Sequence, residues 1–290
     1  MSAATSRYEV PQPLADAAAA PRLERGDGVA EIAFGRTGLR HLYQRTPCRV
    51  LFPLPEPGDL PVAALLTTSG GLAGGDRLRL AVAAEAGARA VATTAAAEKV
   101  YRSLGPETQV AVSLTSAEDA WLEWLPQETI LFEGARLVRR VSADIAAAGR
   151  LLAAETLVFG RAARGECFTR GLLHEAWRVR ADGRLVWADA LRLDGDVAAR
   201  LGAPTAFAGA RAVATAIYVG PDAADHLPLA RVLTEESDGC GSASLVNGVL
   251  VARLLGMRAD NVRAALIRYI TGLRHAAAAL PAALPRLWHT

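Results

Sequence analysis

Four short stretches of the 290-residue sequence carry the residue types that bind or transform ligands. The first is residues 70–76, where two glycine pairs lead to Asp76. Glycine lets a backbone approach an anion closely, so the segment is a candidate phosphate cradle. No Lys-Ser or Lys-Thr pair follows, and residues 77–82 alternate like a strand instead of forming a helix that could hold the anion. We favour a tight connection between strands in which Asp76 caps its own backbone. The glycines are Gly70, Gly71, Gly74 and Gly75.

The second stretch, residues 93–103, places four polar side chains within five positions: Glu98, Lys99, Tyr101 and Arg102. A desolvated lysine can lower the pKa of a neighbouring phenol, so Lys99 and Tyr101 form a candidate catalytic pair. Their spacing is not the Tyr-x-x-x-Lys of dehydrogenases, and no nucleotide-binding fingerprint precedes them. A surface or interface patch is therefore the favoured interpretation.

The third and fourth stretches combine apolar segments with carboxylates. In residues 121–130, two closely spaced tryptophans predict a packed strand end, and Glu123 and Glu128 form a possible acid/base pair. Carboxylates five residues apart are common, so that pair is weak. Residues 157–166 predict an apolar strand that runs into a loop able to bind an anion, or one held only by a local ion pair. The loop residues concerned are Gly160, Arg161 and Glu166.

Conventional catalytic and metal-binding sets are weak in this sequence. The five histidines lie far apart and the three cysteines have no C-x-x-C spacing, which argues against a structural zinc. Ser69 does not stand in a G-x-S-x-G elbow, because Thr67 occupies the position of the first glycine. A hydrolase or anion-binding enzyme that uses residues 70–76 with Lys99 stays open as the alternative. The residues themselves favour a scaffold over an enzyme.

Composition excludes several classes of protein. There are 32 basic and 30 acidic residues, a net charge of +2, so no dedicated nucleic-acid surface is expected. No run of eighteen apolar residues predicts a membrane span, and we expect no membrane partner. Residues 1–22 read as a flexible leader without the apolar core of a secretory signal, and the odd, scattered cysteines suit a reducing compartment. We therefore expect a cytoplasmic protein.

The chemistry-bearing stretches lie between short segments that predict strands. Residues 62–68 form a compact apolar run, whereas residues 77–82 and 110–114 alternate strictly between apolar and other side chains. The pair Asp182 and Gly183 between two apolar segments predicts a β-hairpin with a type I′ turn.

Helical patterns are confined to the last third of the chain. Residues 226–233 predict a short helix, and an apolar stripe from Val262 to Leu280 predicts an amphipathic helix. We expect Asp260 to be its N-cap and the helix to end before Pro281. With no clear repeat period and no linker, the sequence predicts a mainly β fold in one large domain, residues 23–290.

Read together, the stretches resemble the urease accessory protein UreD (UreH) family. The family pattern is matched at residues 70–76, 93–103, 122–128 and 160–166, and residues 285–290 resemble its Pro-Arg-Ile-Trp-x-Thr ending. Each motif alone is weak, but five in the same order over nearly the whole chain make a strong signal.

The resemblance implies stacked β-sheets in a single large domain with one or two C-terminal α-helices. It also implies a role without turnover: binding urease apoprotein subunits and recruiting the helical accessory protein UreF, which docks the nickel-carrying GTPase UreG. No permanently bound cofactor is expected, and Ni²⁺ is expected only in transit.

The family is also thought to offer an internal polar route for the metal. By resemblance, Asp76, Glu155 and Asp189 fall at acidic positions on that route. Spaced oxygen ligands release an intermediate divalent ion more easily than a Cys/His cluster, which suits a relay. Lys99, the only lysine of the chain, matches the family's own lysine, which predicts a need for a compact ammonium that arginine does not meet.

Overall fold

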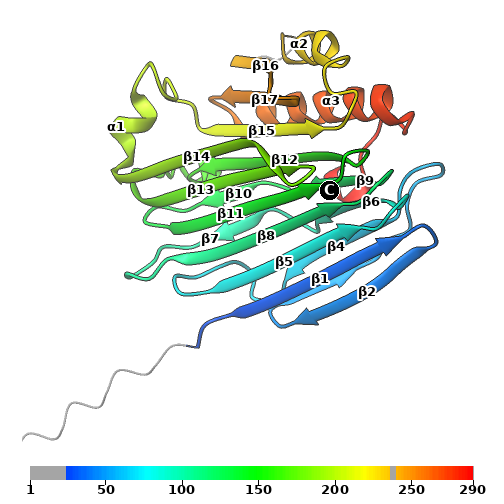
Figure 1. Ribbon diagram of the computed structural model, residues 1–290. Coiled ribbons are helices and arrows are strands. Elements are labelled where there is room, and N and C mark those ends of the chain that lie inside the picture. The colour runs from blue at the N-terminus through cyan, green and yellow to red at the C-terminus, as the bar shows by residue number, and fades with distance from the viewer. Residues whose placement is uncertain (1–23, 236–239, 290) are drawn as a thin grey trace, which may run out of the picture.

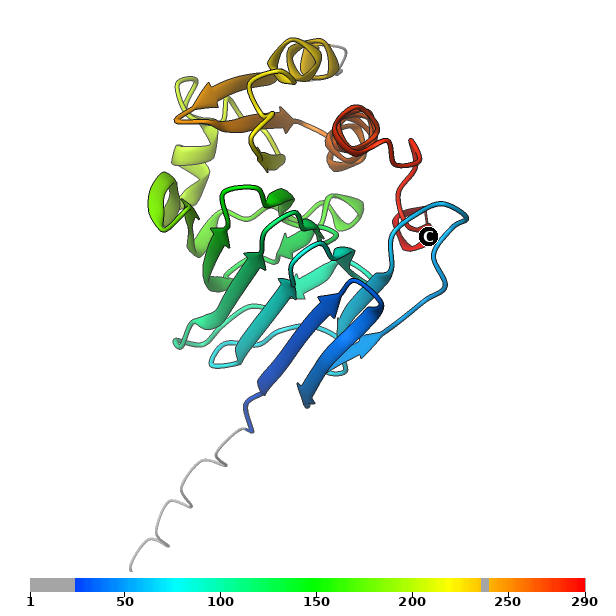
Figure 2. The same cartoon turned by 45° about the vertical axis from the view of Figure 1, so that its right-hand side comes forward.

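Two β-sheets packed face to face make up most of the protein (Figures 1 and 2). The structure is a computed structural model and describes residues 24–235 and 240–289. The predicted leader, residues 1–22, lies outside the described residues. The seven-stranded sheet has the order β14-β13-β11-β8-β5-β1-β2. Its strands are β1 Asp27–Gly35, β2 Gly38–Arg45, β5 Arg77–Ala84, β8 Thr108–Ser116, β11 Arg136–Ile145, β13 Arg170–Ala181 and β14 Arg184–Asp196.

The ten-stranded sheet has the main order β16-β17-β15-β12-β9-β6-β4-β3, and β10 joins it to β7 at one end. Its strands are β3 Cys48–Leu51, β4 Val62–Thr67, β6 Arg89–Thr94, β7 Glu98–Val100, β9 Trp121–Leu125, β10 Thr129–Leu131, β12 Arg150–Phe159, β15 Ala212–Val219, β16 Cys240–Val246 and β17 Val249–Gly256. The predicted mainly β fold of stacked sheets is confirmed.

The chain winds between the sheets as a short solenoid. From β5 to β13 it alternates between the seven-stranded and the ten-stranded sheet, so that β5, β8, β11 and β13 pair in parallel on one side. Strands β6, β9 and β12 pair in parallel on the other side. The backbone therefore repeats although the sequence has no clear repeat period, because the coils share a path and not a sequence motif.

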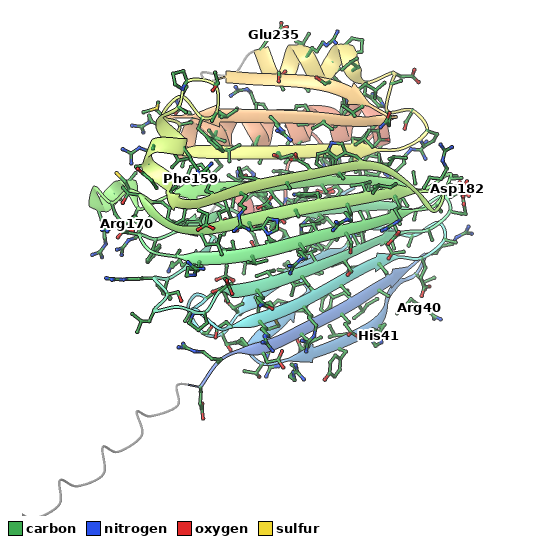
Figure 3. The ribbon with its side chains drawn as sticks, turned by 60° about the vertical axis from the view of Figure 1, so that its left-hand side comes forward. Arg40, His41, Phe159, Arg170, Asp182 and Glu235 are labelled. Carbon is green, nitrogen blue, oxygen red and sulfur yellow. The ribbon has the colours of Figure 1, made fainter. Side chains whose placement is uncertain are left out.

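Alternation along the strands decides what lies between the sheets. In β12, Leu151 and Ala153 face the core between the two sheets, whereas Leu152 and Ala154 face the opposite side, toward the C-terminal helix. The ten-stranded sheet is therefore covered on both faces. Figure 3 shows that no helix formed by the described residues crosses the outer face of the seven-stranded sheet.

The predicted hairpin joins β13 to β14. Asp182 and Gly183 form a two-residue turn with φ values of 50° and 72°, as a type I′ turn requires, and the hairpin prediction is confirmed. This hairpin forms the edge of the seven-stranded sheet nearest β15 (Figure 1).

In the described part of the chain, three α-helices and two 3₁₀ turns accompany the sheets: α1 Val197–Gly202, α2 Leu227–Glu235, α3 Ala259–Ala278, η1 Ala162–Arg164 and η2 Arg286–His289. The predicted short helix is α2, shifted by one or two residues, whereas α1 was not predicted. Helix α3 buries the predicted stripe and ends before Pro281. Its N-cap is Arg258, so the assignment of Asp260 as N-cap was wrong. Asp260 lies in the first turn and pairs with Arg258 instead, where its charge still complements the helix dipole. Among the described residues, none of these helices is long and apolar enough to cross a membrane.

The C-terminal segment is held against the ten-stranded sheet by Trp288. This side chain is 2% exposed, and its indole N–H lies 3.1 Å from Oγ1 of Thr93 and 3.3 Å from the carbonyl oxygen of Leu125. The guanidinium of Arg263 in α3 lies over the ring, 4.9 Å from its centroid, and donates to the Trp288 carbonyl. The ending noticed in the sequence therefore ties the last residues to β6, β9 and α3.

We expect Trp288→Ala to lower the free energy of unfolding by about 3–5 kcal/mol, because it opens a cavity in a packed core. The neighbouring Arg286→Ala serves as the control: its side chain is 85% exposed, and its ion pair with Glu56 is screened by water. Urea unfolding of both variants is the measurement. Equal effects of the two substitutions would contradict the structural role of Trp288.

Candidate functional site

Three of the four stretches found in the sequence meet at one end of the two sheets. Leu72 pairs with Val100, which joins the glycine loop to β7, and Arg102 pairs with Ala135 ahead of β11. The amide of Gly160 donates to the carbonyl of Leu131, which brings in the fourth stretch. The sequence motifs thus build one region.

Asp76 fastens the glycine loop. Its two carboxylate oxygens accept the amide N–H groups of Gly26 and Ala73, each at 2.7 Å. The predicted backbone capping is confirmed. Gly74 is required for packing, because a Cβ there would lie 2.0 Å from the Ser103 hydroxyl oxygen and 2.6 Å from the carbonyl oxygen of Pro106. The hydroxyl that the alternative enzyme would use, on Ser69, donates to the carbonyl of Gly71 within the loop.

The polar side chains of the second and fourth stretches form a lid over this end. The Tyr101 hydroxyl donates to the carbonyl of Gly70 at 2.8 Å, and its ring packs edge-on against Phe132. The guanidinium of Arg161 lies over the Phe132 ring, 4.1 Å from its centroid, and makes two hydrogen bonds to Glu166. The hydrogen bonds from Arg161 lower the pKa of Glu166. The predicted local tie between Arg161 and Glu166 is confirmed.

The third stretch faces the other side of the ten-stranded sheet. Glu123 is fully buried beneath α3, where its Oε1 accepts from Nε of Arg274 at 3.1 Å, so it contributes nothing to the surface of this chain. Arg274 also pairs with Asp59 at 2.6 Å. Glu128 accepts two hydrogen bonds from Arg263 at 2.6 and 2.8 Å. Each carboxylate of the suspected acid/base pair is thus held by an arginine of α3.

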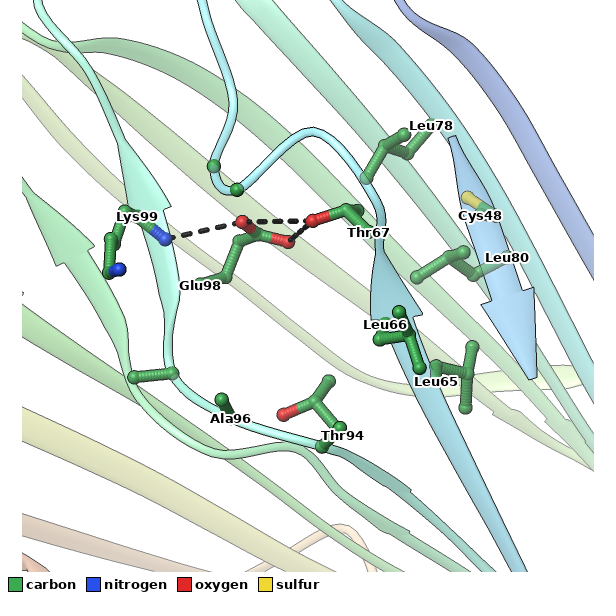
Figure 4. Close-up of a pocket in the computed structure, with 14 residues that line it drawn as sticks. Cys48, Leu65, Leu66, Thr67, Leu78, Leu80, Thr94, Ala96, Glu98 and Lys99 are labelled. Atoms are coloured by element: carbon green, nitrogen blue, oxygen red, sulfur yellow. Dashed lines mark hydrogen bonds between the residues drawn. The ribbon is translucent and has the colours of Figure 1, made fainter. Parts of the chain in front are cut away.

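A first cavity of about 180 Å³, which we call the loop cavity, opens beside the glycine loop (Figure 4). Glu98 projects into it and accepts hydrogen bonds from the Thr67 hydroxyl at 3.1 Å and the Lys99 amide at 3.2 Å. Lys99 leaves β7 on the opposite side, as strand alternation requires. Burial raises the pKa of Glu98.

Cys48 lines the same cavity as a free thiol. Burial raises its pKa to about 11, and the nearby Glu98 adds to the rise, so the thiol is protonated at neutral pH. Within the described ranges, no group of three or more His, Cys, Asp or Glu side chains could hold a metal ion. The Cys240 side chain lies outside the described residues.

A buried ionic cluster occupies the layer between the two sheets. Arg139 of β11 donates to Oε2 of Glu175 through Nε, at 3.1 Å, and through Nη2. Its Nη1 donates to Thr129 at 2.8 Å and also lies 2.8 Å from Oε2 of Glu155, an ion pair without hydrogen-bond geometry. Burial raises the pKa of Glu155 to about 7, Arg139 opposes the rise, and Glu175 adds to it.

Two more cavities flank this cluster. The inner cavity, about 60 Å³, is lined by Glu98, Arg139 and Glu155, and it shares Glu98 with the loop cavity. The outer cavity, about 270 Å³, is lined by Glu155 and Glu175 and reaches Asp189. Asp189 is 29% exposed and pairs with Arg253 at 2.5 Å. Shared lining residues therefore place the three cavities in a row, with a carboxylate at each step.

The structure brings together residues that the sequence analysis had treated separately, and it adds others. Glu98, Glu155 and Asp189 line the same row, whereas Asp76 lies beside it as a backbone anchor. Arg139 and Glu175 were missed. Each occupies an inward position of an alternating strand, where the neighbours are apolar. The signal that could have revealed them is a charged residue at a strand position where the alternation calls for an apolar side chain.

Comparison with known proteins gives a consistent family. The model of the family described as UreD urease accessory protein matches residues 26–289. A urease accessory protein UreD from Methylobacterium sp. (strain 4-46) is 45% identical over 281 residues, 93% of this chain and 97% of the relative. The same-named protein of Granulibacter bethesdensis is 47% identical over 239 residues, 82% of this chain and 99% of the relative.

The pKa of Glu155 predicts how stability depends on pH. Because folding raises this pKa from 4.5 to about 7, the folded state binds the proton more tightly than the unfolded chain. The contribution to stability is complete below pH 4.5 and is lost as the pH rises through about 7. Glu155→Gln mimics the protonated acid. We therefore expect the difference between its free energy of unfolding and that of the wild type to shift in favour of Glu155→Gln by on the order of 1–3 kcal/mol as the pH rises from 4.5 to 7.5.

Urea unfolding at several pH values measures this difference. Glu85→Gln controls for the loss of one negative charge, since Glu85 is 53% exposed. If the stabilities of the wild type and of Glu155→Gln changed in parallel across this pH range, the raised pKa of the buried Glu155 carboxyl would be contradicted.

Proposed function

The chain belongs to the UreD family of urease accessory proteins, and from this premise we propose that it is a non-catalytic scaffold through which nickel reaches apo-urease. In this proposal it binds the urease apoprotein subunits and a UreF-type helical accessory protein. A UreG-type GTPase docks on UreF and supplies the metal. GTP hydrolysis is the work of that partner.

The observation that carries the proposal is the row of three cavities between the sheets. Glu98 stands between the loop cavity and the inner cavity, and Glu155 stands between the inner cavity and the outer cavity. A divalent ion that moves along this row meets carboxylate oxygen at each junction and at the far end, where Asp189 lies. We infer that the row is the passage for Ni²⁺, with Asp76 fixing the loop at its entrance.

The donor set along this passage suits transit. Carboxylate, hydroxyl and carbonyl oxygens hold an intermediate divalent ion less strongly than thiolate and imidazole groups. The Cys48 thiol, whose pKa burial raises to about 11, is protonated at neutral pH and is a poor ligand. Ni²⁺ is thus a passing cargo in this proposal, and the chain has no permanently bound cofactor.

Lys99 has a separate place in the proposal. Its exposed side chain stands at the glycine-loop end, beside the mouth of the loop cavity. A compact ammonium there can contact a partner carboxylate as a point charge, whereas the wider guanidinium demands a planar, two-pronged acceptor. We propose that Lys99 makes such a contact in the assembled complex.

The route predicts a loss of nickel delivery in Asp189→Ala without a loss of assembly. Asp189 lines the outer cavity and is replaceable without disturbing the core, because it is partly exposed. Asp194→Ala is the matched control: Asp194 lies on the same strand and also pairs with an arginine, Arg192, but on the outer face. Co-purification with the urease subunits and nickel per urease active site are the two measurements.

We expect Asp189→Ala to leave the complex intact and the urease under-metallated, with Asp194→Ala indistinguishable from the wild type. Full nickel loading with Asp189→Ala would reject the route. Failure of the unmodified chain to bind urease and the two accessory proteins, together with normal urease activity in its absence, would reject the accessory scaffold itself.

Lys99→Arg should reduce urease maturation although it keeps the charge. The structural reason is the one given above, a contact that fits an ammonium and excludes a guanidinium. Arg102→Lys, an equally conservative exchange three positions along, is the control. The measurement is the amount of urease complex recovered with each variant, beside its nickel content. Normal maturation with Lys99→Arg would show that any cation suffices.

A further inference from the structure

The strongest unassigned feature is the position of the Arg139 guanidinium, which lies between two carboxylates at the junction of two cavities. On one side, Nη1 lies 2.8 Å from Oε2 of Glu155. On the other, Nε and Nη2 both contact Oε2 of Glu175. The Arg139 side chain is 6% exposed, so it lies between the sheets and out of reach of bulk water.

The two carboxylates are oriented by neighbours other than Arg139. The indole N–H of Trp124 donates to Oε1 of Glu155 at 2.9 Å. That of Trp177 donates to Oε1 of Glu175 at 3.1 Å. Each tryptophan fixes one oxygen, and the remaining oxygens, both Oε2, converge on the same guanidinium. The hydroxyl of Thr129, 2.8 Å from Nη1 of Arg139, adds a third oxygen around that point.

The charges in this place do not balance. Two carboxylates face one guanidinium, so one negative charge is left over when both are ionised. Oε2 of Glu155 is buried and accepts no hydrogen bond, and the residue lines both the inner and the outer cavity. Buried charges without full compensation are costly. A doubly charged cation would balance the two carboxylates where a singly charged guanidinium does not.

Arg139 also blocks the passage. It lines the inner cavity, Glu175 lines the outer cavity, and Glu155 is common to both. An ion that passes from one cavity to the other must therefore pass between Glu155 and Glu175, where the guanidinium lies. The cavities, about 60 and 270 Å³, leave space for a flexible arginine side chain to swing aside.

We propose that Arg139 is the gate of the passage: its guanidinium fills a two-carboxylate divalent-ion site formed by Glu155 and Glu175, and leaves it when an ion passes. This inference rests on the proposed nickel route and adds a named site and a means of control. In the closed state the arginine substitutes for the cargo and keeps other cations out. In the open state the two Oε2 atoms and the Thr129 hydroxyl hold the ion weakly enough to release it.

The test removes the gate and measures metal binding. In Arg139→Met the guanidinium is lost while an unbranched apolar side chain is kept, so the two carboxylates should take up a divalent ion directly. We expect the purified full-length variant to bind one Ni²⁺ more than the wild type, with an affinity for that ion at least roughly tenfold higher. Equilibrium dialysis with nickel alone gives the stoichiometry, and quenching of tryptophan fluorescence reports binding beside Trp124 and Trp177.

Two further variants keep the test decisive. Arg139→Gln also removes the charge but retains a polar side chain, and it too should gain the ion. The double variant Arg139→Met with Glu155→Gln carries one buried charge fewer than Arg139→Met and should lose the gained ion. A purely structural arginine would cause loss of folding in the single variants and no gain of nickel.

Folded Arg139→Met and Arg139→Gln proteins that bind no more nickel than the wild type would overturn the gate. A gain of nickel that persists in the double variant would overturn it too, because the ion would lie elsewhere. Nickel loading of urease separates the gate from the route. Under-metallated urease with Asp189→Ala, beside no gain of nickel in the Arg139 variants, would leave the route standing and reject the gate.

Discussion

The buried contact between Arg139 and two glutamates is the constraint around which the rest of this protein is arranged. A guanidinium with carboxylates on both sides lies between two sheets that share an apolar core, and removing ions from water is costly. Keeping them there demands fixed neighbours. The two tryptophans that donate to the Oε1 atoms, and the parallel coils that pair β11 with β13 in one sheet and place β12 in the facing sheet, supply that fixation.

The ten-stranded sheet carries a second buried cluster on its opposite face. There Arg274 of α3 joins Glu123 and Asp59, and Trp288 closes the edge. Here too two carboxylates face one guanidinium, and Oε2 of Glu123 is buried without a hydrogen bond, but the cluster lines none of the three cavities in the row. The adjoining cavities separate their roles: the Arg274 cluster joins α3 to the ten-stranded sheet, whereas the Arg139 cluster lies between the inner and the outer cavity. Only the Arg139 cluster lies on the proposed passage.

The features that short segments of sequence encode are the ones that could be predicted. The type I′ turn at Asp182 and Gly183, the alternation of β5 and β8, and the apolar stripe of α3 depend on neighbours within a few residues. The parallel solenoid does not, because its pairings join segments from different coils and no repeated motif marks them. The gate was missed for the same reason: Arg139 and Glu175 are 36 residues apart and meet only through strand register. The motifs indicated the family, and the resemblance pointed to Asp76, Glu155 and Asp189, of which Asp76 fastens the glycine loop through two backbone amides.

If nickel passes through the space between the sheets, an uncharged bulky side chain placed in that space should stop it, and this is the most direct test. Thr215 pairs with Glu155 across β15 and β12 and lines the outer cavity, so Thr215→Phe narrows the passage without altering any charge. The measurement is the nickel content of urease matured with this variant, taken from complexes whose assembly is confirmed. We predict assembled complexes with nickel-poor urease. Fully loaded urease, with the cavity filled by the phenyl ring, would contradict the account.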